Sequence, residues 1–151
     1  MLRDDINNAL KDAMKARNER SVSTLRLMNA AIKDKDIEAR GLSKGPLSDE
    51  DLLSLFQKMI KQRQESAELY DKGGRPELAK QENEEIAIIT AYLPKQMSDD
   101  ETRAAIAEAI KETGAASMKD MGKVIGALRG KYVGKMDFAK ASGLVKGMLA
   151  G

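Results

Sequence analysis

The chain has 151 residues, 33% of them charged and 42% hydrophobic, a balance typical of one globular domain or two small ones. It contains no cysteine and no histidine, which excludes disulfides, thiolate or imidazole metal ligands, and a histidine general base. The net charge of +2 is uneven, with +2 in residues 1–40, −5 in residues 41–113 and +5 in residues 114–151. We therefore expect the C-terminal segment to face an anionic partner.

Helical periodicity of apolar residues begins at the N-terminus. A first helix is predicted with an apolar face made of Leu2, Ile6, Leu10 and Met14. A second helix is predicted to begin near Ser21 or Ser23 as its cap, with an apolar face of Val22, Leu25, Met28 and Ile32. The glycine- and proline-containing segment 41–46 then breaks the helical pattern.

Two further helices are predicted in the middle of the chain. Ser48 and the three acids after it form an N-terminal capping pattern, and this helix is expected to stop at Gly73. This helix is predicted to run through Leu52, Leu55, Met59, Arg63 and Tyr70. Pro76 is suited to the first turn of the next helix, and Pro94 is expected to end it.

Three shorter helices are predicted in the C-terminal part. Ser98 and Glu101 form a capping box that opens a helix ending at Gly114. Ser117 opens the next helix, residues 130–136 are predicted to be a loop, and Asp137 caps the last helix. No period-two alternation indicates a strand. The sequence thus predicts an all-α protein, with about four helices in residues 1–94 and three in residues 95–151.

Glycines at four-residue spacing distinguish the C-terminal part. One series consists of Gly122, Gly126, Gly130 and Gly134. Each glycine inside a helix lowers the stability of that helix by roughly 1 kcal/mol relative to alanine, so the series needs an explanation. The spacing favours tight packing of one helix against another, with a solvated basic face. The alternative is that a nucleic-acid backbone approaches the glycines beside the positive charges. The cations of the stretch are Lys123, Arg129, Lys131, Lys135, Lys140 and Lys146.

Two polar groups in the N-terminal part are candidate sites. The spacing of Arg26, Asn29 and Lys33 places them on one helix face, and they could form a polar groove with Arg63 and Glu82. The simpler interpretation is an internal network that joins helices. The acids Glu82, Glu84 and Glu85 are expected to be solvated or salt-bridged rather than metal-binding, so no metal or other cofactor is predicted.

Several segments carry a resemblance to a known family. They are Ser23–Lys33, Lys61–Ser66, Gly74–Ala79, Glu82–Ile86, Tyr92–Gln96 and Met121–Gly130. With them the chain resembles the YqeY-like family, which is related to the C-terminal tail of the GatB subunit of the tRNA-dependent amidotransferase. The resemblance implies a larger N-terminal helical subdomain and a small C-terminal three-helix one. It also implies a tRNA-holding role, since the related tail holds the tRNA body.

The leading functional hypothesis is a non-catalytic accessory module for tRNA or another structured RNA. The residues predicted to bind RNA are Gly122, Lys123, Gly126, Arg129, Gly130, Lys131, Lys135 and Lys140. A single aromatic among these cations, Tyr132, is too few for base stacking, so phosphate and 2′-hydroxyl contacts are expected. The alternatives are a component of a glutamine-dependent carbon–nitrogen ligase that is active only with partner subunits, or a protein–protein adaptor.

No catalytic residues are predicted for the chain alone. The phosphate-binding pattern of glycines followed by Lys and Ser or Thr is missing, and no activated nucleophile is visible. We therefore expect no hydrolysis of glutamine or ATP by the isolated chain. The N-terminus has no apolar signal core and no apolar run reaches membrane-spanning length, so a cytoplasmic protein without a membrane partner is expected.

Overall fold

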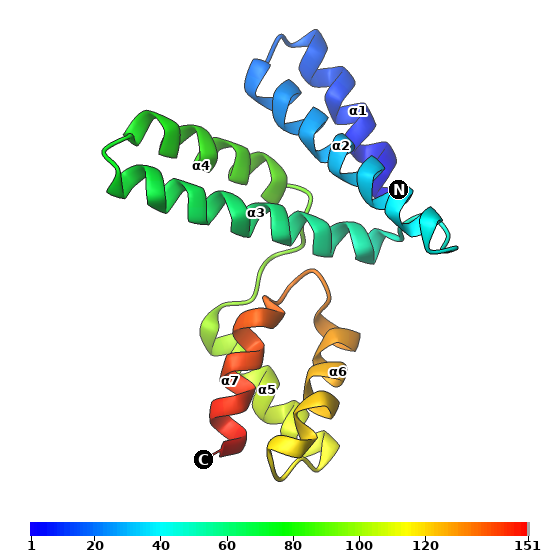
Figure 1. Ribbon diagram of the computed structural model, residues 1–151, viewed down its shortest axis with the longest axis vertical. Helices are drawn as coiled ribbons and strands as arrows, with labels where there is room; N and C mark the ends of the chain where they lie inside the picture. The colour runs from blue at the N-terminus through cyan, green and yellow to red at the C-terminus, as the bar shows by residue number, and fades with distance from the viewer. Residues whose placement is uncertain (151) are drawn as a thin grey trace. The chain divides into compact units, whose positions relative to one another are not determined.

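The computed structural model describes residues 1–150 and contains only helices and their connections over this range (Figure 1). The elements are α1 (Leu2–Lys15), α2 (Glu19–Gly41), α3 (Asp49–Lys72), α4 (Pro76–Thr90), α5 (Asp99–Thr113), the 3-10 turn η1 (Met118–Asp120), α6 (Met121–Tyr132) and α7 (Phe138–Ala150). The predicted all-α class is confirmed. The chain divides into two compact units, an N-terminal unit of Met1–Leu93 and a C-terminal unit from Pro94 onward.

Several helix ends lie where local signals predicted them. The hydroxyl groups of Ser48 and Ser98 each accept a hydrogen bond at 3.2 Å from the backbone N–H three residues later, completing the capping boxes of α3 and α5. Pro76 is the first residue of α4. Gly114 ends α5 with a φ of 67°, a left-handed conformation that glycine adopts without strain.

The start of α2 differs from the prediction. The helix begins at Glu19, and the side chain of Asn18 is its cap, accepting a hydrogen bond of 3.1 Å from the backbone N–H of Ser21. Ser23 is already inside the helix, where its hydroxyl donates to the carbonyl of Arg20 at 3.1 Å. Asparagine caps a helix as well as serine does, so the earlier residue takes this position.

The end of α6 also differs from the prediction. Residues 130–136 were expected to be a loop, but α6 continues through Tyr132. Leu128 is buried in the core of the C-terminal unit and Tyr132 packs against that core, so helical geometry is favoured across Gly130. As a consequence Lys131 lies on the last turn of a helix, and only Lys135 lies in the connection that follows.

The N-terminal unit consists of two helical hairpins, α1–α2 and α3–α4 (Figure 1). Its fully buried core includes Ile6, Met28, Leu52, Phe56 and Ile89. The predicted apolar face of α1 is wrong at its end, because Met14 is 50% exposed and Ala13 is buried in its place. Residues 6, 10 and 13 keep the spacing of four and three that follows one face of a helix.

An ion pair fastens the loop between α2 and α3. Two guanidinium nitrogens of Arg3 donate to the two carboxylate oxygens of Asp36, each at 2.7 Å, and Asp36 also accepts the backbone N–H of Leu47 at 3.2 Å. The hydrogen bonds from Arg3, followed by the bond from Leu47, lower the pKa of Asp36 to about 2. Asp36 therefore stays ionised well below neutral pH, and the loop stays attached to α1 and α2.

The C-terminal unit packs α5, α6 and α7 around its own core. The fully buried side chains at its centre are Ile106, Val124, Leu128, Met136 and Val145. The segment before α5 is hydrogen-bonded to the connection between α6 and α7, since Met97 donates its backbone N–H to the carbonyl of Lys135 at 2.9 Å. None of the helices within residues 1–150 combines the length and the apolar character needed to cross a membrane.

Candidate nucleic-acid interface

The glycines of α6 lie on an exposed face of the helix. Val124 and Leu128 of the same helix are buried, whereas Gly122, Gly126 and Gly130 are exposed. Apart from its chain neighbours and the nearby backbone of α6 itself, a Cβ atom built on any of these three glycines meets no atom within 4 Å. Tight packing against another helix was the favoured interpretation of the glycine spacing. Within the described chain these three glycines pack against nothing, so that interpretation does not account for them.

The predicted cations of the C-terminal unit divide into paired and unpaired side chains. Lys131 donates to Glu112 of α5 at 2.9 Å, Lys123 lies 4.0 Å from Asp120, and Lys140 pairs with Asp99. Each of these lysine side chains is more than half exposed, and such surface pairs contribute little to stability because solvent screens them. Lys135 has no carboxylate partner among residues 1–150, nor has Lys146.

Two of the predicted RNA-binding residues also contribute to the structure of the unit. The guanidinium of Arg129 lies over the ring of Phe138, 5.7 Å from its centre, and so connects the end of α6 to the start of α7. The hydrogen bond between Lys131 and Glu112, and then the attraction of their charges, raises the pKa of Lys131 and lowers that of Glu112. Both groups are ionised at neutral pH, and an anion can compete with Glu112 for Lys131.

The structure does not bring together the five residues considered for a polar groove. Arg26 and Lys33 are exposed, and Asn29 donates to the side chain of Asn7 in α1 at 3.2 Å. Arg63 and Glu82 instead belong to the region where α3 packs against α4. The face of α2 that carries Arg26, Asn29 and Lys33 is therefore separate from Arg63, and an internal network forms elsewhere.

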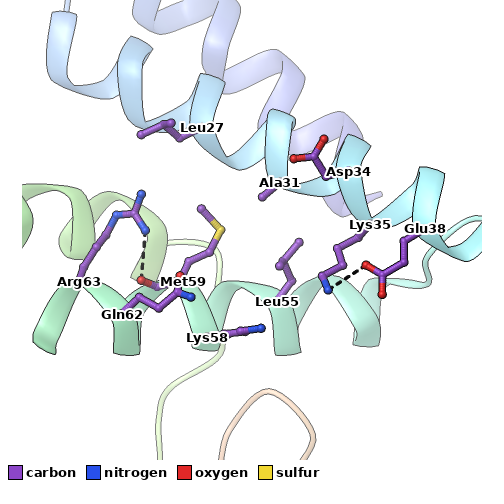
Figure 2. A pocket seen from close by; sticks show the side chains of 10 residues that line it. All are labelled: Leu27, Ala31, Asp34, Lys35, Glu38, Leu55, Lys58, Met59, Gln62 and Arg63. Carbon is purple, nitrogen blue, oxygen red and sulfur yellow. Dashed lines mark hydrogen bonds and ion pairs between the residues drawn. The ribbon is translucent and has the colours of Figure 1, made fainter. Parts of the chain in front are cut away.

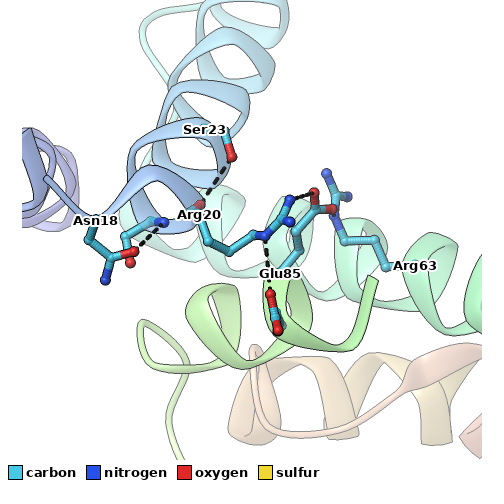
Figure 3. Close-up of polar contacts among 7 residues, drawn as sticks. Asn18, Arg20, Ser23, Arg63 and Glu85 are labelled. Carbon is cyan, nitrogen blue, oxygen red and sulfur yellow. Dashed lines mark hydrogen bonds and ion pairs between the residues drawn. The ribbon is translucent and has the colours of Figure 1, made fainter. Parts of the chain in front are cut away.

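That network centres on Glu85, which is only 7% exposed (Figure 3). Its carboxylate accepts a hydrogen bond from Arg63 at 2.9 Å and lies 3.9 Å from Arg20, which also donates to Glu84 at 3.2 Å. Burial, and then the charge of Glu85, raise the pKa of Glu82. The prediction of salt-bridged acids is confirmed for Glu84 and Glu85. Residues 1–150 contain no group of three or more acidic side chains placed to hold a metal ion.

Sequence reasoning missed the role of Arg20 in this cluster. Arg20 belongs to α2, whereas its acidic partners belong to α4, more than sixty residues later. No local pattern indicates which of several arginines reaches a particular glutamate. The burial of Glu85 rather than Glu82 or Glu84 has the same origin, because it depends on how α3 and α2 pack against α4.

The exposed glycine face leads to a prediction about stability. Gly126→Ala should raise the free energy of unfolding of the C-terminal unit by about 1 kcal/mol, because alanine favours a helix and the added Cβ meets no neighbour. Urea unfolding combined with hydrogen exchange of the α6 amides measures this change. Gly114→Ala is the control of opposite sign, because a φ of 67° is unfavourable for alanine although the surrounding space is equally open. A destabilised Gly126→Ala protein would contradict the exposed position of Gly126.

Comparison with known proteins gives the family. The family model described as "Yqey-like protein" matches residues 3–149. Altered inheritance of mitochondria protein 41 of Eremothecium gossypii is 36% identical over 84 residues, which cover 56% of this chain and 44% of that protein. The protein of the same name from Pyrenophora tritici-repentis is 28% identical over 129 residues, covering 82% of this chain and 69% of its own.

An uncharacterised protein of Schizosaccharomyces pombe is 32% identical over 94 residues, covering 62% of this chain and 73% of its own. Against the Eremothecium relative, the chain spans less than half of that protein's length. The relatives called protein 41 are named as mitochondrial proteins. Because the family model matches nearly all of the sequence, from the first turn of α1 to the last turn of α7, the chain belongs to the YqeY-like protein family.

Proposed function

We propose that the chain is a non-catalytic accessory module that binds tRNA or another structured RNA through its C-terminal unit. The observation that carries the proposal is the open glycine face of α6, which exposes helix backbone within a segment of charge +5. Stability alone does not explain these glycines, because each lowers the stability of the helix and none improves packing. A ribose–phosphate backbone can approach such a face more closely than a face covered by larger side chains.

The cations around this face are suited to phosphate groups. Lys135 is unpaired within residues 1–150, and the pairs made by Lys123, Lys131 and Lys140 are exposed enough for phosphate to replace the carboxylate. Contacts of this kind read backbone and shape rather than sequence. The resemblance to the amidotransferase tail favours tRNA among the structured RNAs.

The test is a titration of the full chain with tRNA at several salt concentrations. Lys131→Gln combined with Lys135→Gln should weaken binding about tenfold at low salt and reduce the slope of log affinity against log salt by roughly 1.5–2, because two phosphate contacts are lost. Neutral glutamine avoids placing an acid beside Glu112. The matched control is Lys11→Gln with Lys61→Gln, two exposed lysines of the N-terminal unit, which should leave the affinity unchanged. Equal affinity of all three proteins at low salt would exclude this binding surface.

A second variant tests the glycine face itself. Gly126→Leu should leave the stability of the chain equal or higher, because leucine favours a helix and the site is open, while tRNA binding falls. Gly41→Leu is the control, since Gly41 at the end of α2 is also exposed and open but belongs to the N-terminal unit, outside the predicted interface. Unchanged binding by Gly126→Leu would show that RNA does not approach this face.

A further inference from the structure

A groove runs between α2 and α3 in the N-terminal unit. It contains one cavity of about 400 Å³ (Figure 2) and a second of about 370 Å³. The two cavities share Lys35 and Glu38 of α2 and Leu55 and Lys58 of α3, so they form one continuous depression. None of the residues proposed to bind RNA lines it.

The groove has the length of a short helix. Its α2 side extends from Leu27 to Leu42, and its α3 side extends from Asp51 to Arg63. At 1.5 Å per residue these sides measure about 22 Å and about 18 Å, so a helix of roughly 12–15 residues fits between them. On both sides the lining residues recur at three- and four-residue spacing, which means that each helix contributes one continuous face.

The floor of the groove is apolar and uncovered. Leu27 is 46% exposed at the first cavity, where Ala31 and Leu55 are partly buried (Figure 2). Leu42 at the second cavity is 63% exposed. The other contacts of α2 are with α1 and α4, and α3 packs mainly on α4, so no helix of the N-terminal unit covers this face. These two exposed leucine side chains, one at each cavity, offer apolar surface that a partner helix can remove from water.

At the first cavity, each rim has one charge that is free to pair, and the two charges are of opposite sign. Asp34 on the α2 side and Lys58 on the α3 side line the groove, and neither has a partner among residues 1–150. Among the other charges, Lys35 pairs with Glu38, Arg63 pairs with Glu85, and Asp51 at the second cavity accepts the backbone N–H of Ser48. Lys44 lines the second cavity but not the first, and it is also unpaired within residues 1–150. In helix pairs, charges that flank an apolar seam select a partner with the opposite charge at the facing position.

From the apolar floor and the two rims we infer that the groove binds an amphipathic helix of a partner protein. The helix has an apolar stripe at positions i, i+3, i+4 and i+7, a basic residue that faces Asp34 and an acidic residue that faces Lys58. This inference goes beyond the proposed RNA binding and does not rest on it, because it concerns the other unit and another class of partner.

The test uses synthetic 15-residue helical peptides and the full chain. All peptides carry the same leucine stripe; one has lysines along one flank and glutamates along the other, a second has lysines on both flanks, and a third has glutamates on both. The mixed peptide should bind more tightly than either of the others by about tenfold, because each uniform peptide places a like charge against either Asp34 or Lys58. In Lys58→Glu the preference should change to the all-lysine peptide. Three peptides of equal affinity, or no binding by the mixed peptide, would overturn the inference.

A variant of the floor provides the second measurement. Leu27→Asp should weaken binding of the mixed peptide at least about tenfold, whereas Ile37→Asp should not, because Ile37 is a 56% exposed α2 residue that lines neither cavity. Both substitutions are at exposed sites, and circular dichroism checks that the helices remain. If the chain forms a dimer and Leu27→Asp abolishes that dimer, the choice of a partner protein is overturned, because the occupant of the groove is then a second copy of the chain. Binding of tRNA should be the same in both variants.

Discussion

Glu85→Ala is expected to lower the free energy of unfolding by about 3 kcal/mol. Glu85 is 7% exposed, and its carboxylate accepts a 2.9 Å hydrogen bond from Arg63, whose side chain is only 15% exposed. Removal of one member of a buried ion pair leaves the other charge desolvated, which costs about 3–5 kcal/mol. We expect the lower end, because Arg63 keeps its 3.2 Å bond to the carbonyl of Met59 and has Glu82 nearby. Urea unfolding followed by circular dichroism measures the difference.

Glu84→Ala is the matched control for Glu85→Ala. Glu84 is the preceding residue of α4 and also pairs with Arg20, but both side chains are more than a third exposed, so the expected loss is about 0–1 kcal/mol. Arg63→Met combined with Glu85→Leu should recover much of the loss, because no charge is then left buried without a partner. Equal losses for Glu84→Ala and Glu85→Ala would contradict the central role of Glu85. In Glu85→Ala the pKa of Glu82 should fall, because the charge of Glu85 helps to raise it.

Leu128→Ala is expected to destabilise the C-terminal unit by about 2–5 kcal/mol. Leu128 is 1% exposed and packs among Ile106, Val124 and Val145, so truncation leaves a cavity at the centre of this core. A unit of about 60 residues has a total stability of only roughly 3–9 kcal/mol. The substitution therefore removes a large part of it, and the α6 face proposed for RNA should lose its ordered geometry at moderate temperature.

Hydrogen exchange of the α5, α6 and α7 amides measures the effect of Leu128→Ala, since it reports the opening of this unit directly. Met148→Ala in α7 is the control, because Met148 is 41% exposed and its truncation should change stability by less than about 1 kcal/mol. Protection factors that are equal in the Leu128→Ala and Met148→Ala proteins would show that Leu128 is not part of a tightly packed core.

The ends of the helices depend largely on neighbouring residues, and for this reason the sequence predicts most of them. The capping boxes at Ser48 and Ser98, the proline at the start of α4 and the glycine after α5 are confirmed, since each depends on contacts within about four residues. Two helix ends were predicted wrongly, for different reasons. At the start of α2, Asn18 and the nearby serines are all suitable caps, and Asn18 takes the position. At the end of α6, core packing extends the helix across Gly130 to Tyr132.

Which face of each helix is covered was decided by tertiary packing. Sequence spacing could not distinguish glycines that admit a neighbouring helix from glycines that face open space, because both have the same period of four. It could not select Glu85 for burial among three nearby acids, or show that the face of α2 containing Leu27 stays uncovered while the face containing Asn29 meets α1. Helical periodicity defines the faces of a single helix, but their partners depend on residues dozens of positions away, and only the folded chain brings those residues together.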